Sequence, residues 1–192
     1  MPKLFIISGC NGSGKTTATY SLLPAMLDCH EFVNSDEFAK SISPFDPSEA
    51  SVTASRQMLL KINYLMSMNS DLGIETTLAT RSLLHIIEEA RARGYKITII
   101  YLWVESPELA LKRVRSRVEA GGHDIPEETV RRRYDIGLRY FFDKYKDVCD
   151  RWVLADNSRP PFAVVAEGAP GRTRIRNEKL YNRIIQDLDD QH

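Results

Sequence analysis

The sequence predicts an α/β protein, with a mostly parallel sheet and helices on both of its faces. Short apolar runs alternate along the chain with longer amphipathic segments, which is the order typical of such a sheet. A glycine-rich loop follows the first apolar run directly and opens the first helical segment. The length of 192 residues fits one domain, 1–192, with a substantial core.

The predicted strands are short and almost wholly apolar. Strands buried on both faces of a parallel sheet have this composition, because helices cover them on either side. The strongest prediction is residues 96–104, where Ile97, Ile99, Ile100 and Leu102 form a nearly continuous run. The other predicted strands are residues 3–8, 29–33, 71–76 and 151–155, with 162–167 as a further candidate.

The predicted helices are bounded by proline and glycine. Proline is favoured in the first turn of a helix, and glycine is favoured just after the last turn. The predicted helices cover residues 15 to about 24, 48–68, 83–93, 107 to about 119, 126 to about 145, and 177–188. Residues 159–174 are rich in proline and glycine and are predicted to be the least ordered stretch.

The overall charge argues against some classes of partner. Lys and Arg total 26 and Asp and Glu total 26, so the formal net charge is zero. A protein that coats nucleic acid or an anionic membrane would carry a basic excess. No apolar run approaches the roughly 20 residues of a membrane span, so we expect a cytoplasmic protein without membrane contact. Three widely spaced cysteines without a CxxC pair suggest neither a disulfide framework nor a zinc site.

The glycine-rich loop carries the chemistry that is most specific in this sequence. Residues 9–16 read GCNGSGKT and match the phosphate-binding pattern G-x-x-x-x-G-K-[ST]. Backbone N–H groups and the N-terminus of the following helix would surround the phosphates of ATP. Lys15 would contact the β- and γ-phosphates, and the Thr16 hydroxyl would bind Mg²⁺. The predicted nucleotide-binding residues are Gly9, Asn11, Gly12, Ser13, Gly14, Lys15, Thr16 and Thr17.

Other classes of nucleotide-binding protein are disfavoured by missing motifs. The apolar strands end in Glu105-Ser106 and Glu75-Thr76, and neither resembles the Asp or Asp-Glu ending of a motor ATPase. The guanine-reading NKxD motif and the transporter motif LSGGQ are both absent. Cys10 lies within the loop and is either a redox-sensitive thiol or a tolerated small residue.

Polar residues at two other strand ends form a candidate acceptor site. Ligands of a doubly wound sheet bind outside the carboxyl ends of its strands, which would bring Asp36, Glu75 and Thr77 near the γ-phosphate. Asp36 is a candidate general base for an acceptor hydroxyl, or alternatively the N-cap of a helix at residues 37–39. Glu75 and Thr77 would hold the acceptor or magnesium-bound water, unless they simply satisfy a neighbouring loop.

An arginine-rich segment at about residues 113–133 is predicted to be a closing lid. Its two helices are separated by Gly121-Gly122, and bidentate arginines stabilise the charge that develops during phosphoryl transfer. Arg117 and Arg133 are the predicted catalytic cations. The alternative for any single lid arginine is a place on a solvated helix face.

These blocks together resemble the zeta toxin family of P-loop kinases. The resemblance rests on residues 9–17, 34–37, 75–78, 117–126 and 133–134, and on the strand end 156–158, which contains Asn157. It implies an ATP-dependent kinase with Lys15 on the phosphate, Asp36 as base, Glu75 and Thr77 on the acceptor, and Asn157 on the adenine side. It further implies UDP-N-acetylglucosamine, a nucleotide sugar, as a small-molecule acceptor and a small antitoxin as a partner.

Three functions remain open on the sequence. The first is a kinase that acts on a small hydroxylated metabolite, as the acidic strand ends and the lid indicate. The second is a polynucleotide or RNA-end kinase, which zero net charge and the lack of an aromatic-rich basic groove disfavour. The third is a regulatory ATP-binding protein with little turnover, for which the Met-rich helix 48–68 would be either a docking surface or a core element.

Overall fold

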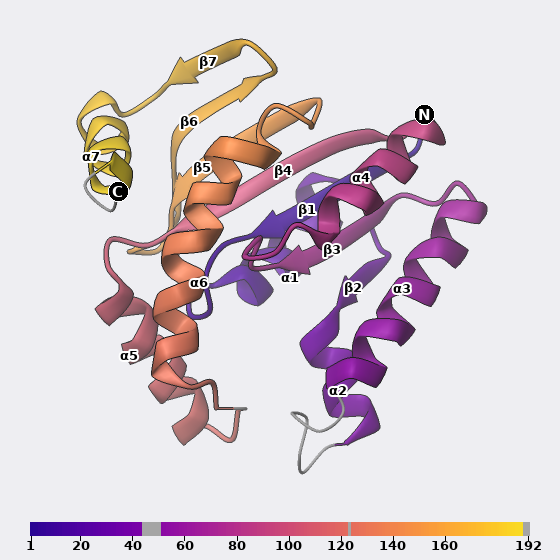
Figure 1. Cartoon of the computed structure of the whole chain (residues 1–192), viewed down its shortest axis with the longest axis horizontal. Helices are drawn as coiled ribbons and strands as arrows, with labels where there is room; N and C mark the ends of the chain where they lie inside the picture. The colour runs from indigo at the N-terminus through magenta and orange to yellow at the C-terminus, as the bar shows by residue number, and fades with distance from the viewer. Residues whose placement is uncertain (44–50, 123, 190–192) are drawn as a thin grey trace.

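A seven-stranded sheet organises the computed structural model (Figure 1), which describes residues 1–43, 51–122 and 124–189. The strand order is β2-β3-β1-β4-β5-β6-β7. The first five strands in the chain pair in parallel, which confirms the predicted α/β class. They are β1 (Lys3–Ser8), β2 (Phe32–Asn34), β3 (Leu72–Thr76), β4 (Lys96–Trp103) and β5 (Arg151–Asp156).

Helices connect these strands or follow the last strand, and all but the one at residues 35–42 lie near their predicted positions. They are α1 (Lys15–Met26), α2 (Ser35–Ile42), α3 (Ser51–Ser67), α4 (Ser82–Ala92), α5 (Pro107–Glu119), α6 (Glu127–Tyr140), the π-helical turn η1 (Phe141–Tyr145) and α7 (Glu178–Asp189). Helix α1 continues two residues past Pro24, because a proline in the last turn removes only one donor. The expected start of α3, residues 48–50, lies outside the described residues.

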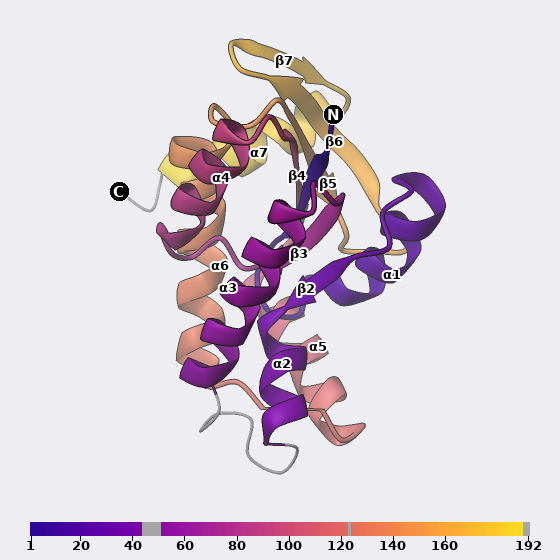
Figure 2. The ribbon, with the colours of Figure 1, turned by 90° about the vertical axis from the view of Figure 1, so that its right-hand side faces the viewer.

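The sheet buries apolar side chains on both faces, as its composition predicts. Leu4 and Ile6 of β1 belong to the large core cluster, which also contains residues of α3, α4, α6 and α7. Phe5 and Ile7, the alternate residues of the same strand, pack instead with Ala18 of α1. Figure 2 accordingly shows α3, α4 and α6 on one side of the sheet and α1 on the other. Of the methionines in the predicted helix 48–68, Met66 is part of the core and Met58 packs against it, whereas Met68 is 62% exposed, so the packing alternative holds only in part.

The prediction that residues 159–174 are the least ordered stretch is wrong. They contribute most of a β-hairpin, β6 (Ala163–Ala169) and β7 (Arg172–Ile175), which extends the sheet in the antiparallel sense. Gly171 supplies the tight turn with a φ of 70°. Strand β7 reads RTRI and is exposed throughout, so it lacks the apolar pattern by which the other strands were recognised. Among the described helices, none is both long enough and apolar enough to cross a membrane.

Candidate active site

The glycine-rich loop occupies the turn between β1 and α1, as the motif requires. Gly12 and Gly14 have φ values of 80° and 86°, in a region that side-chain-bearing residues rarely adopt. A Cβ at Gly14 would also lie 2.4 Å from Asn157 Nδ2. Glycine is therefore strongly favoured at both positions for the loop to hold this shape.

Lys15 lies over this loop and is 7% exposed. Its Nζ donates a hydrogen bond of 2.8 Å to the backbone carbonyl of Cys10. The ammonium group is thus held inside the curve of the loop, where the predicted contact with the β- and γ-phosphates would place it.

Thr16 and Glu75 connect the loop to the end of β3. The Thr16 hydroxyl donates to Glu75 Oε1 at 3.0 Å. Hydroxyl and carboxylate oxygens are hard donors that suit Mg²⁺, which takes one or two protein ligands and completes its shell with phosphates and water. The described residues contain no group of three or more His, Cys, Asp or Glu side chains able to hold a metal. The residues present therefore fit a magnesium ion that arrives with the nucleotide.

The other predicted acceptor residues lie at the same edge of the sheet. Asn34 at the end of β2 pairs in register with Glu75, and α2 begins at the next residue, Ser35. The backbone of Asp36 lies in the first turn of α2, whereas its side chain is outside the described part of the structure. Thr77 follows β3 directly and is half-buried.

The two lid arginines that were predicted to take part in catalysis lie in different surroundings. Arg133 of α6 reaches the loop, where its Nη1 donates to Asn11 Oδ1 at 3.0 Å. Arg117 lies exposed on the last turn of α5, with its Cγ close to Gly122. Arg131, by contrast, pairs with Glu108 and Glu127, which joins α5 to α6 away from the loop.

Sequence reasoning missed Arg113 as a contact of the loop. Its guanidinium donates to the carbonyls of Asn157 and Ser158, each at 2.9 Å, and approaches that of Gly12 at 3.5 Å. Asn157 Nδ2 donates to the carbonyl of Ser13 at 2.7 Å. These two side chains tie the phosphate loop to the end of β5. In the sequence, Arg113 is one of many lid arginines and has no distinguishing signal.

The loop after β3 has an unusual backbone. Leu78 is 1% exposed and adopts a φ of 55°, which is uncommon for a residue with a side chain. Its N–H bonds to Thr76 Oγ1 at 3.1 Å, and the carbonyl of Thr80 accepts a hydrogen bond of 2.5 Å from Tyr145 Oη. The bond to Thr76 is local, but Tyr145 lies 65 residues from Thr80, and no sequence pattern indicates that contact.

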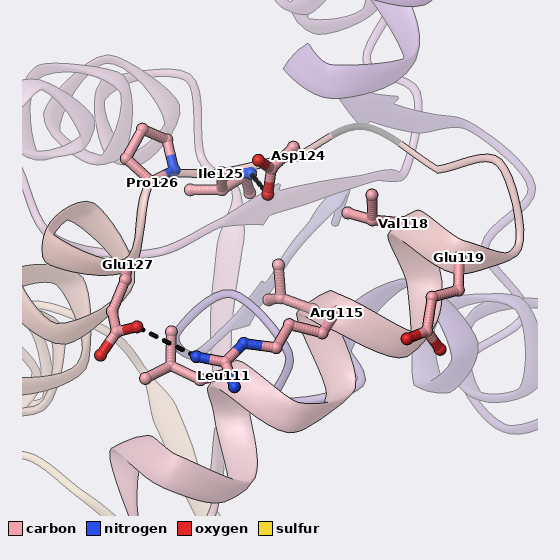
Figure 3. Close-up of a pocket in the computed structure, with 9 residues that line it drawn as sticks. Leu111, Arg115, Val118, Glu119, Asp124, Ile125, Pro126 and Glu127 are labelled. Atoms are coloured by element: carbon pink, nitrogen blue, oxygen red, sulfur yellow. Dashed lines mark hydrogen bonds and ion pairs between the residues drawn. The ribbon is translucent and has the colours of Figure 1, made fainter.

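A cavity of about 420 Å³ lies in the lid, against α5 (Figure 3). Leu111, Val114 and Val118 line it from α5, and Ile125 and Pro126 line it from the segment before α6. Arg115 and Glu127 meet across its rim in an ion pair of 3.1 Å. None of the predicted nucleotide or acceptor residues lines this cavity, so it is separate from the candidate active site.

Burial governs the electrostatics of the cysteine in the loop. Desolvation raises the pKa of the Cys10 thiol from 9.0 to about 11, although the positive charge of Lys15 partly opposes it. A thiol with so high a pKa is protonated and unreactive near neutral pH. The structure therefore favours the tolerated-residue interpretation of Cys10 over a redox role.

Comparison with known proteins identifies several that are similar to this chain in sequence or in structure. An uncharacterized protein of Haemophilus influenzae is 29% identical over 132 residues, which are 69% of this chain and 92% of that protein. The AvrRxo1-ORF1:ORF2 complex with ATP contains a chain with a TM-score of 0.76 and 19% identity. The match covers 96% of this chain but only 63% of that one. A structure from the PezAT toxin-antitoxin system of Streptococcus pneumoniae has a TM-score of 0.67 and 15% identity, with 99% and 85% coverage.

The solved structures share the fold at low identity, whereas the family assignment rests on the sequence itself. The zeta toxin family model matches residues 1–158, which include the phosphate loop, the ends of β2 and β3, the lid and Asn157. Among the described elements, the β6–β7 hairpin and α7 lie beyond the matched segment. The chain therefore belongs to the zeta toxin family.

Proposed function

We propose that this protein is an ATP-dependent kinase that transfers the γ-phosphoryl group to a hydroxyl of a small metabolite. Because the chain belongs to the zeta toxin family, UDP-N-acetylglucosamine is the first acceptor to test. The observation that carries the proposal is the 3.0 Å hydrogen bond between Thr16 and Glu75. It joins the residue suited to bind magnesium to the strand end suited to bind an acceptor, so both substrates would meet at one edge of the sheet.

In the proposed reaction, an acceptor hydroxyl oxygen forms a bond to the γ-phosphorus as the bond to the bridging oxygen of ADP breaks. The hydroxyl proton passes to the Asp36 carboxylate, and Glu75 and Thr77 orient the acceptor. Lys15 and Arg133 stabilise negative charge on the phosphoryl oxygens, and Arg117 would join them when the lid closes. Bound magnesium would add positive charge at the phosphates. Asn157 would border the adenine, beside the loop that it contacts.

The decisive experiment measures product formation from ATP, Mg²⁺ and UDP-N-acetylglucosamine by mass spectrometry. We expect a phosphorylated sugar from the wild-type protein and none above background from Lys15→Ala or Asp36→Asn. Asp147→Asn is the matched control, since it makes the same chemical change at an exposed position outside the site. ATP turnover without a phosphorylated sugar would exclude this acceptor, and a lack of ATP binding would refute the proposal.

We also propose that a small antitoxin-like protein controls this kinase. The support comes from two similar structures: the PezAT structure is described as part of a toxin-antitoxin system, and AvrRxo1-ORF1 is complexed with ORF2. Purification of the protein from its native host would reveal such a partner as a second, smaller chain. If that chain suppresses ATP turnover in a titration, the proposal stands, and a protein that purifies alone and fully active would contradict it.

A further inference from the structure

Helix α6 contacts both sides of the candidate active site within one helical turn. Arg133 bonds to Asn11 in the phosphate loop, and Gly137 packs against the loop that follows β3. Residues four apart lie on the same face of a helix and are separated by about 6 Å along its axis. One turn of α6 therefore spans the distance from the nucleotide side to the acceptor side.

Gly137 makes this second contact possible because it has no side chain. A Cβ at this position would lie 2.5 Å from the carbonyl oxygen of Thr77 and 3.2 Å from Tyr101 Oη. Glycine is unfavourable in the middle of a helix, where it lacks the backbone restriction that a side chain provides. Its presence in α6 is explained by this close approach of helix and loop.

Tyr145 anchors the far end of the same loop. Its hydroxyl donates a 2.5 Å hydrogen bond to the carbonyl of Thr80, and the residue is 0% exposed. Burial raises the pKa of Tyr145 to about 12, so the hydroxyl remains a donor throughout the physiological range. Between the two anchors lies Leu78, whose φ of 55° requires support from its surroundings.

The helix itself is fixed to the sheet between these contacts. Tyr134 Oη donates to the carbonyl of Val104, just after β4, at 2.8 Å. Arg133, Tyr134 and Gly137 thus connect α6 to the phosphate loop, the sheet and the Thr77–Thr80 loop respectively. A displacement of the helix would change the spacing between the two loops.

We propose that Gly137 and Tyr145 are positioning residues, which hold the 77–80 loop at a set distance from the phosphate loop and so align the acceptor with the γ-phosphate. The inference rests on the proposed function, in which Glu75 and Thr77 bind the acceptor. It assigns no chemistry to Gly137 or Tyr145. Their effect reaches the reaction only through the backbone of the 77–80 loop.

The test compares Gly137→Ala and Tyr145→Phe with Glu128→Ala, an exposed substitution in the first turn of the same helix. An added methyl group at residue 137 would displace the helix or the loop by roughly 1 Å, enough to reduce transfer up to about 100-fold. We expect both variants to raise KM for UDP-N-acetylglucosamine or to lower kcat, with Gly137→Ala affected more. The dissociation constant for ATP should remain within about twofold of the wild-type value. Glu128→Ala should change neither quantity.

A second measurement tests this inference without the acceptor, so its result does not depend on which acceptor the protein uses. Hydrogen exchange of a peptide covering residues 76–82 reports directly on the loop, with a non-hydrolysable ATP analogue and Mg²⁺ present. We expect faster exchange in both variants, with unchanged protection of residues 9–17. If wild-type protein forms no phosphorylated sugar, the proposed acceptor is wrong, and this exchange measurement alone decides the inference.

The outcomes leave the inference either supported or overturned. Unchanged exchange at residues 76–82 in a folded Gly137→Ala protein would overturn it, as would an equal loss of ATP affinity. If Gly137→Ala does not fold, Tyr145→Phe decides alone, because it removes one hydroxyl and preserves the ring. Wild-type exchange and wild-type transfer kinetics in Tyr145→Phe would then refute the positioning role.

Discussion

The phosphate loop and the 77–80 loop face the same proposed reaction but are built in opposite ways. The phosphate loop owes much of its shape to its own residues, including glycines at positive φ and a lysine that bonds to the carbonyl of Cys10, five residues earlier. Asn157 adds a distant contact to the loop. The 77–80 loop owes its shape to Gly137 and to Tyr145, which is 65 residues away from Thr80 in the sequence. Local geometry of the first kind appears as a motif, whereas geometry of the second kind leaves no pattern in the sequence.

Substitution within the phosphate loop should have the largest effect. In Lys15→Ala, loss of the buried ammonium group is expected to lower the rate of phosphoryl transfer by about 10³-fold, the scale of removing one strong electrostatic contact. The measurement is ADP formation under saturating ATP. Lys179→Ala, an exposed substitution in α7, is the control and should retain full activity. A Lys15→Ala protein with near wild-type turnover would contradict the role of the loop in catalysis.

This difference between the loops also explains how much could be predicted. The phosphate-loop motif at residues 9–17 and the five parallel strands could be predicted because the motif and the apolar runs are contiguous in sequence. Strand β7 was missed because an exposed edge strand such as RTRI need not be apolar. Arg113 was missed because its partners are backbone carbonyls of Asn157 and Ser158, and any sequence can supply a carbonyl. Arg133 was predicted together with Arg117, and the structure shows Arg133 hydrogen-bonded to Asn11 of the phosphate loop.

The two lid arginines Arg133 and Arg131 allow a comparison between an arginine at the phosphate loop and one on the lid surface. Arg133→Ala removes a contact to Asn11 and the cation that we propose to act on the phosphates, so we expect transfer to fall by about 10- to 100-fold. Arg131→Ala removes exposed ion pairs with Glu108 and Glu127 and should leave transfer nearly unchanged. We would measure kcat/KM and thermal unfolding for both variants. A larger loss of kcat/KM in Arg131→Ala than in Arg133→Ala would contradict these assignments.

Gly14→Ala tests the phosphate loop by the same kind of change that tests the acceptor side at Gly137. The variant would force a side chain into a φ of 86° and against Asn157, so we expect ATP affinity to fall by about 10-fold. Gly171→Ala is the matched control, since its φ is 70° but a Cβ there would meet nothing within 4 Å. It should lower stability without changing ATP affinity. Calorimetric titration of both variants with an ATP analogue measures this difference. Equal affinities in Gly14→Ala and Gly171→Ala would show that the phosphate loop tolerates the strain.

Cys10 provides the smallest expected effect, because it lies within the phosphate loop but is proposed to take no part in the reaction. Its raised pKa means that folding favours the neutral thiol, so this contribution to stability is complete below pH 9.0 and is lost as the pH rises toward about 11. At pH 8 we expect iodoacetamide to leave Cys10 unmodified in the folded protein and to alkylate it in urea. Peptide mass spectrometry measures this directly. Rapid alkylation of the folded protein at pH 8 would restore the redox interpretation and would show that the loop opens far more readily than its buried contacts imply.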